Sequence, residues 1–210
     1  APGLIERLSP TGYESVKRVA SVLATEDPQK AITLTANSIQ TIDNLLARFE
    51  PDQVVDIYNI GYELANTNAQ LGLKFILVAD QLAAHNDIEK FFIVSTMAQK
   101  IAAISHAAAK AYLGVASALF TRIEIDALLK LVDEVIPIAV KSWETASRLF
   151  VKSPDLIDRV GLSGLMTVAE FAAFLAPKDH SAAVLLLDKA CRILDELKKI
   201  DGVELLPDIF

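Results

Sequence analysis

Apolar side chains recur along most of the chain at the three- to four-residue spacing of one helical face. In the segment 12–24, for example, Val16, Val19 and Leu23 share such a face. Long runs of alternating apolar and polar residues, which are typical of β-strands, are absent. The pattern therefore predicts an all-α protein of about ten helices. They are expected at about 12–24, 28–49, 51–64, 69–84, 86–104, 105–120, 121–150 (with a kink or break at 135–137), 154–160, 165–175 and 181–199.

The segment 149–154, Leu-Phe-Val-Lys-Ser-Pro, has the pattern of a helix end, a short turn and a helix start. Ser153 is suited to cap the new helix, and Pro154 suits its first position because no backbone donor is needed there. Asp27 and Pro28 have the same relation to the apolar residues before them. Looser copies occur at 64–68, 101–105 and 175–179. We expect all five segments to join antiparallel helical hairpins.

If the apolar residues that precede these turns are equivalent, they mark repeating units. These residues are Leu23, Leu64, Ile101, Leu149 and Leu175, and they lie 41, 37, 48 and 26 residues apart. The spacing is uneven but lies near that of paired-helix repeats. It predicts an irregular α-solenoid, and a non-repetitive helical bundle is the alternative. We expect one domain over 11–200, an N-terminal tail over 1–10 and a C-terminal tail over 201–210.

Other signals predict where single helices begin or break. Residues 11–14 and 121–124 each read Thr-x-x-Glu, the spacing of a capping box, and predict helix starts. Pro137 lies within a helical pattern and predicts a kink or break at 135–137, because proline removes a backbone donor. The glycines at the two ends of 161–164 predict a second short break.

Composition narrows the class of protein. The apolar fraction of 52% and the mean hydropathy of +0.37 are high, but aromatic residues supply only 7%. The net charge of −7, without a basic stripe, argues against a nucleic-acid partner. The most apolar segment, 91–120, contains Lys100, His106 and Lys110. We therefore expect a buried helix pair there and no membrane span.

The single cysteine, Cys191, excludes an internal disulfide and favours a reducing compartment. The first seven residues also lack the apolar region of a secretory signal peptide. We therefore expect a cytoplasmic protein. Because Cys191 lies in a helical pattern between Leu187 and Leu194, we interpret it as a buried structural thiol and not as a nucleophile.

The three histidines, His85, His106 and His180, are too far apart in sequence to form a local metal-binding motif. We expect His106 at a helix start or bonded to a partner, and the other two at exposed turns. Residues 161–164 lack the lysine of a phosphate-binding loop. Four serines are interpreted as caps or turn residues: Ser105, Ser142, Ser153 and Ser181. We predict no catalytic, cofactor-binding or metal-binding residue and no enzyme activity.

Trp143 is the only tryptophan and has two interpretations. Val140 and Ala146 flank it at helical spacing, which favours a place in the core. The alternative is an exposed side chain that anchors a protein partner, since tryptophan often carries much of the binding energy of an interface.

The stretch 142–160 carries a spaced set of residues: Ala146, Phe150, Ser153, Pro154, Leu156 and Ile157. This set resembles the helical repeats that precede the von Willebrand A domain in NorD/CoxE-like proteins, which take part in nitric oxide reductase activation. The helix ends at 23–24, 64–65 and 175–176 resemble the same repeats. The chain lacks the Asp-x-Ser-x-Ser run of a von Willebrand metal site and most tryptophans of the repeat pattern. The resemblance implies the helical part of an activator that works with a MoxR-type AAA+ ATPase in metalloenzyme maturation.

Stacked hairpins without a catalytic motif favour a protein-interaction scaffold, which binds an unidentified protein on one face. The alternative is a helical bundle that binds a small apolar ligand or a lipid. The high mean hydropathy and the alanine-rich segment 91–120 favour this alternative. An enzyme would need a nucleophile–base pair or a ligand spacing, and the sequence contains neither motif.

Overall fold

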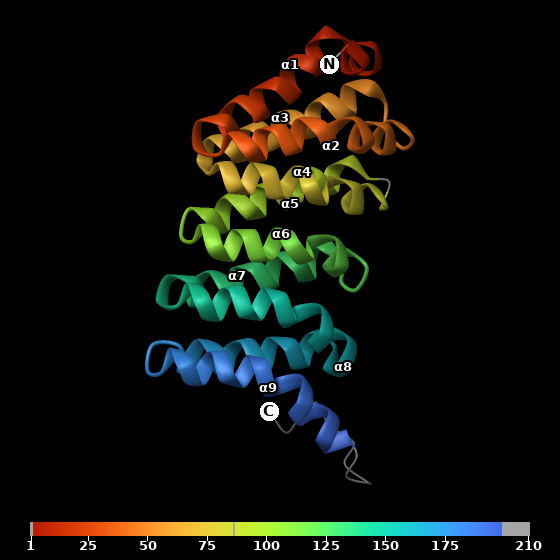
Figure 1. Cartoon of the computed structure of the whole chain (residues 1–210). Helices are drawn as coiled ribbons and strands as arrows, with labels where there is room; N and C mark the ends of the chain where they lie inside the picture. Colours follow the sequence, from red (N-terminus) through yellow and green to blue (C-terminus); the bar gives the residue numbers. More distant parts are fainter. Residues whose placement is uncertain (1, 86, 199–210) are drawn as a thin grey trace. The chain divides into compact units, whose positions relative to one another are not determined.

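The computed structural model describes residues 2–85 and 87–198, and α-helices form nearly all of this part of the chain (Figure 1). The helices are α1 (Pro2–Glu26), α2 (Pro28–Leu46), α3 (Pro51–Thr67), α4 (Ala69–Ala83), α5 (Ile88–Ala102), α6 (His106–Phe120), α7 (Ile125–Lys141), α8 (Trp143–Leu175) and α9 (His180–Lys198). A kink at Gly161 divides α8 into two helices, which makes ten helical segments among the described residues. No β-strand occurs in them. The predicted all-α class is confirmed.

The helices belong to two compact units, residues 1–99 and 100–210, where one domain over 11–200 was expected. In the first unit, α1 packs against α2 and α3, and α3 packs against α4. In the second unit, α8 packs against α6, α7 and α9. The pairs α1–α3 and α6–α8 show that a helix contacts the next helix but one as well as its neighbour. This is the packing of antiparallel helical pairs (Figure 1).

Close contact between α3 and α4 in the first unit depends on small residues. A Cβ atom on Gly72 would lie 2.6 Å from the Gly61 carbonyl oxygen and 2.4 Å from the Ala65 Cβ. Real side chains do not approach so closely, so only glycine allows these two helices to pack at this spacing. Near this contact surface Phe91 packs edge-on against Phe49, with ring centroids 5.7 Å apart. Small residues therefore set the helix spacing, and a few aromatic rings fill the remaining space.

In the second unit, α8 is held by an aromatic pair and a bidentate ion pair. The rings of Tyr112 in α6 and Phe150 in α8 are buried, with centroids 5.4 Å apart. Burial raises the pKa of the Tyr112 hydroxyl above its ordinary value, so the hydroxyl stays protonated. Just after α6, Arg122 donates hydrogen bonds of 2.9 Å and 2.8 Å, from Nε and Nη2, to the Asp158 carboxylate. These hydrogen bonds hold the pKa of Asp158 below its usual range.

Four of the five predicted junctions lie between helices. At each one a side-chain oxygen accepts a hydrogen bond from a backbone N–H in the first turn of the following helix. The caps are Asp27 (to Gln29 N, 3.1 Å), Asn68 (to Gln70 N, 3.0 Å), Ser105 (to Ala108 N, 3.2 Å) and Asp179 (to Ala182 N, 2.9 Å). The turns that these caps define are short, so consecutive helices run antiparallel.

The fifth predicted junction, 149–154, is wrong because these residues lie inside α8. Ser153 does not cap a helix: its hydroxyl donates to the Leu149 carbonyl oxygen one turn earlier, at 2.7 Å. An interior proline such as Pro154 costs about 3 kcal/mol. Each fully buried large apolar side chain contributes roughly 1.5–3 kcal/mol, so the burial of Leu149 and its neighbours offsets that cost. The chain breaks instead at Gly161, where φ is 71°, as predicted for 161–164.

The predicted N-terminal tail, 1–10, belongs to α1 from residue 2 onward. Pro10 lies inside this helix, and Leu8 is almost completely buried. Burial of Leu8 in the first unit offsets the hydrogen bond that Pro10 cannot make, so the helix begins well before the predicted capping box at 11–14. The predicted C-terminal tail, 201–210, lies outside the described residues.

The connection between α6 and α7 also differs from the prediction. The Thr121 hydroxyl donates to the Ala118 carbonyl oxygen at 2.7 Å, so this residue closes α6 and does not cap the next helix. Helix α7 starts after Glu124 without a side-chain cap. It then continues through Pro137 to Lys141, so no break occurs at 135–137. Buried residues on both sides of Pro137 again offset one missing hydrogen bond.

The kink at Gly161 provides a stability test. Its backbone, with φ 71° and ψ −177°, lies in a region that is open almost only to glycine, although a Cβ there would meet no atom within 4 Å. Gly161→Ala should therefore lower the free energy of unfolding by about 1–3 kcal/mol through backbone strain alone. Urea unfolding midpoints measure this. Ser163→Ala, on the exposed side of the same segment, is the control and should change stability by less than about 0.5 kcal/mol. Equal midpoints for both variants would show that α8 is not kinked at this residue.

The Arg122–Asp158 pair provides a pH test. The pKa of Asp158 is lower in the folded protein than its value of about 3.9 in the unfolded chain. The ionised carboxylate therefore stabilises the fold at pH values above about 3.9, and this stabilisation is lost as the pH falls through the folded pKa. Asp158→Asn should therefore lower the urea midpoint at neutral pH, and the difference from wild type should disappear in strong acid. Glu170→Gln, at an exposed site on α8, is the control. A difference that persists unchanged in acid would contradict the assignment.

Candidate functional site

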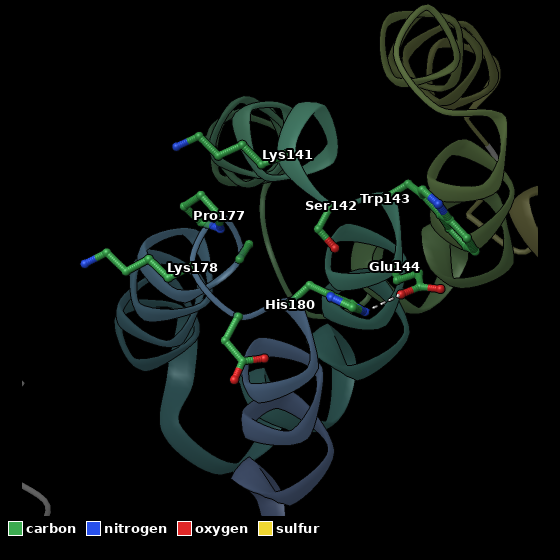
Figure 2. Close-up of a pocket in the computed structure, with 9 residues that line it drawn as sticks. Lys141, Ser142, Trp143, Glu144, Pro177, Lys178 and His180 are labelled. Atoms are coloured by element: carbon green, nitrogen blue, oxygen red, sulfur yellow. Dashed lines mark ion pairs between the residues drawn. The ribbon is translucent and has the colours of Figure 1, made fainter.

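A cleft in the second unit lies where two turns meet, and we call it the Trp143 cleft (Figure 2). One wall is the turn from α7 to α8, and the other is the turn from α8 to α9. The cleft is open to solvent and has a volume of about 560 Å³. Its lining residues are Lys141, Ser142, Trp143, Glu144, Ala176, Pro177, Lys178, Asp179 and His180. Segments more than 30 residues apart in sequence thus form one surface.

Ser142 caps α8 and turns Trp143 outward. The Ser142 hydroxyl oxygen accepts a hydrogen bond from the Thr145 backbone N–H at 3.2 Å and lies 2.9 Å from the Thr145 hydroxyl. Both residues are buried, whereas Trp143, the first residue of the helix, is 52% exposed. The predicted core position of Trp143 is therefore wrong. The reason is the turn itself: Val140 ends up on α7, so Val140 and Trp143 do not share a helical face.

On the other wall, Asp179 caps α9, and His180 is the first residue of that helix. Lys178 lies in the turn, with its ammonium nitrogen 3.3 Å from the centroid of the Phe174 ring. Phe174 is itself exposed. This is a cation–π contact, and it holds the Lys178 side chain against an apolar surface next to the cleft.

One ion pair crosses the cleft. His180 Nε2 lies 3.3 Å from Glu144 Oε2, and the two form an ion pair when the imidazole is protonated. Figure 2 shows the His180 ring directed at Glu144, while Lys141 and Lys178 both extend to the opposite side of the cleft from Trp143. The cleft therefore has an aromatic side and a cationic side, with a paired histidine and carboxylate between them.

The remaining candidate residues lie elsewhere. His106 is the exposed first residue of α6, at a helix start as predicted. His85 lies in the turn after α4 and is half-buried, not exposed as predicted. Cys191 in α9 is half-buried, not fully buried as predicted. Within residues 2–85 and 87–198, no group of three or more His, Cys, Asp or Glu side chains is placed to hold a metal ion. The structure brings together only Ser142, Trp143 and His180 of the residues singled out in the sequence.

The prediction that Ser142 is a cap or turn residue is confirmed, although the helix predicted through Trp143 extended across it. Ser142 is followed by Glu144 and Thr145, and a serine followed by an acidic first turn is typical of a helix start. Pro137 before Ser142 and the Ser153–Pro154 pair after it are stronger sequence signals for a helix boundary, but both lie inside helices. A turn at 142 would have placed Trp143 at a helix start instead of in the core.

A second hollow surface occurs in the first unit, between α1 and α2, and we call it the α1–α2 groove. Its volume is about 710 Å³, and its lining is mostly alanine and isoleucine. The lining residues are Lys17, Ala20, Ser21, Ala24, Pro28, Ala31, Ile32, Thr35, Ala36 and Ile39. Ile32 is 61% exposed and Ile39 is 38% exposed. In the described part of the chain, no helix combines the length and the apolar character needed to cross a membrane.

Because Trp143 is the only tryptophan, its fluorescence reports on the Trp143 cleft alone. An indole that is half exposed should be quenched by acrylamide in the folded protein nearly as strongly as in the urea-unfolded chain. Stern–Volmer plots for the two states measure this. Trp143→Phe, which should have no selectively excited emission, gives the background. Strong protection in the folded state would contradict the exposed position of Trp143.

Comparison with known proteins identified no relative of this chain: no protein-family model, no curated protein and no solved structure matches it. The function is therefore inferred from the geometry and chemistry of the Trp143 cleft and the α1–α2 groove.

Proposed function

We propose that the chain is a protein-interaction module and that a protein partner binds at the Trp143 cleft. The observation that supports this most directly is the exposure of Trp143, 52%, at the edge of an open cleft. Tryptophan offers a large apolar area with few rotatable bonds, and it is enriched among the residues that dominate binding energies. A partner that covers the indole would remove this apolar area from water, which favours association.

The other groups around the cleft indicate the chemistry of the partner. Lys141 and Lys178 extend to one side (Figure 2). The Lys178 ammonium lies 3.3 Å from the ring centroid of Phe174, which is itself exposed. A partner surface with an apolar side chain for Trp143 and a carboxylate for the lysines would be complementary to this arrangement. An open cleft of mixed polarity also suits a peptide or protein better than a small ligand, since small-ligand pockets usually enclose most of the ligand. The proposed function is binding alone, without a chemical reaction.

The resemblance to NorD/CoxE-like proteins adds a specific partner. The stretch in which the matching residues lie, 142–160, begins at the Ser142 cap and contains Trp143. A MoxR-type AAA+ ATPase is therefore the first candidate partner to titrate, and metalloenzyme maturation is the process in which it would act. Cytoplasmic location stays a prediction from the sequence.

The second candidate function, binding of an apolar ligand or a lipid, is favoured by one observation, the alanine- and isoleucine-lined α1–α2 groove. The amount of lipid bound to the purified protein distinguishes the two candidate functions. Organic extraction of the purified protein followed by mass spectrometry should recover a stoichiometric lipid if the groove holds one. The interaction module predicts no such lipid.

Affinity purification with quantitative mass spectrometry tests the proposed function. The full chain, immobilised as wild type, Trp143→Ala and Leu129→Ala, is incubated with lysate from the source organism. Loss of a central tryptophan typically costs 2 kcal/mol or more, so recovery of the partner should fall about 30-fold for Trp143→Ala. Leu129→Ala removes an exposed apolar side chain of α7 outside the cleft and is the matched control, with recovery unchanged.

A captured protein is then purified and titrated against the chain while the Trp143 emission is recorded. A saturable shift of the emission maximum supports direct binding at the cleft. If the two variants retain the same proteins as wild type, or if titration leaves the emission unchanged, the Trp143 cleft is not the binding site.

A further inference from the structure

The second half of α8 and helix α9 form a hairpin with two exposed stripes of similar composition. Each stripe contains two large apolar side chains and one lysine. The four apolar side chains are between 46% and 60% exposed. We call the two sets of residues the α8–α9 stripes: Phe171, Phe174 and Lys178 at the end of α8, and Leu185, Lys189 and Ile193 on α9.

The residues of each stripe lie close enough together to form one contact surface. On α9 they recur every four residues, so they share one side of the helix, whereas Ala183 and Leu187 are buried. At the end of α8 the Lys178 ammonium lies 3.3 Å from the centroid of the Phe174 ring. A cation held on an aromatic ring offers a partner segment both a positive charge and apolar area.

The packing order of the helices explains why these side chains are open. In both units a helix contacts the next helix but one, as in the pairs α1–α3, α2–α4 and α6–α8. Helix α9 is the last described helix, so no described residue continues this order beyond the hairpin. The end of a stacked helical array needs a cover of its own, because its apolar side chains have no next unit to pack against.

The sequence after α9 has the complementary composition. The segment 203–210, which lies outside the described residues, reads Val-Glu-Leu-Leu-Pro-Asp-Ile-Phe. Five of its eight side chains are large and apolar, two are carboxylates and none is basic. The apolar side chains match the exposed residues of the stripes, and Glu204 and Asp208 match the two lysines in number and in sign of charge.

The segment 203–210 is also long enough to run back along α9. This helix has 19 residues and is therefore about 28 Å long. Just after it, Asp201 and Gly202 form a dipeptide typical of tight turns, which reverse the chain. At about 3.3 Å per extended residue, the eight residues that follow span roughly 26 Å. This length is sufficient to pass Ile193 and reach Phe174 near the start of α9.

We propose that the segment 203–210 folds back over the α8–α9 stripes and covers them within the same molecule. A segment tethered to its own site has a high effective concentration, so a contact area too small for a stable dimer is sufficient. The cover would remove an exposed apolar patch of the kind that promotes aggregation. The stripes share only Lys178 with the Trp143 cleft, so the cover does not depend on the partner proposed there.

A single indole placed in the segment tests this contact. In the full chain, Trp143→Phe combined with Phe210→Trp moves the only tryptophan to position 210. Acrylamide should quench this indole at least about threefold less in the folded protein than in urea, because the tethered segment is bound most of the time. Phe174→Asp should raise the quenching to the unfolded value, since a carboxylate replaces the apolar contact.

Two further variants serve as a second test and as a control. Leu185→Asp, on the other stripe, should release the indole in the same way. Val151→Asp, at an exposed valine in the first half of α8, should leave the quenching unchanged. All three altered side chains are about half exposed or more, so the variants should keep their helix content, which circular dichroism measures.

Carbodiimide cross-linking, which joins a carboxylate directly to an amine that it contacts, locates the cover. Mass spectrometry of the wild-type monomer should find Glu204 or Asp208 linked to Lys178 or Lys189. An indole quenched as strongly in the folded as in the unfolded chain overturns the proposal. So do protection that Phe174→Asp and Leu185→Asp leave unchanged, protection that rises with protein concentration, and cross-links from the segment to other lysines alone.

Discussion

The backbone N–H groups at each helix start are the constraint on which both units depend. They have no partner inside the helix, and burying them unpaired would be costly. A short polar side chain supplies the missing acceptor at most of the described helix starts: Asp27, Asn68, Ser105, Ser142 and Asp179. Because a cap sits immediately before the next helix, each turn is short and the helices pack as antiparallel pairs. The apolar stripes then face one another, and small residues such as Gly72 set their distance.

The Trp143 cleft is a direct consequence of two of these caps. Ser142 and Asp179 end two turns that lie side by side in the second unit. The residue after each cap, Trp143 or His180, is the first of its helix and is exposed. A cap must turn its own side chain toward the helix to accept a hydrogen bond, so the next side chain is free to point outward. The chemistry available to a partner is therefore set by the residues beside the caps.

The two candidate surfaces differ in how their polar groups are satisfied. In the Trp143 cleft, Lys141 and Lys178 are exposed and neither is paired with a carboxylate across the cleft in Figure 2, so a partner can contribute the opposite charge. In the α1–α2 groove, Ser21 and Thr35 bond to their own helices, and the lining is mostly apolar apart from Lys17. A charged partner surface suits the first, and an apolar occupant suits the second.

Sequence periodicity was enough for the fold class and for most helix ends, because both depend on local chemistry. An apolar pair followed by Asp, Asn or Ser marks a cap wherever no stronger contact competes, as at Asn68 and Ser105. The same sequence signals predicted a wrong helix boundary at Ser153, whose hydroxyl donates to the Leu149 carbonyl oxygen. Proline was also a misleading signal, because Pro10, Pro137 and Pro154 all lie inside helices. There, burial against helices distant in sequence offsets a missing backbone hydrogen bond. The start of α8 has a local signal at Ser142, but only the tertiary structure decided that this signal prevails over those at Pro137 and Ser153–Pro154, and with it that Trp143 faces solvent instead of the core.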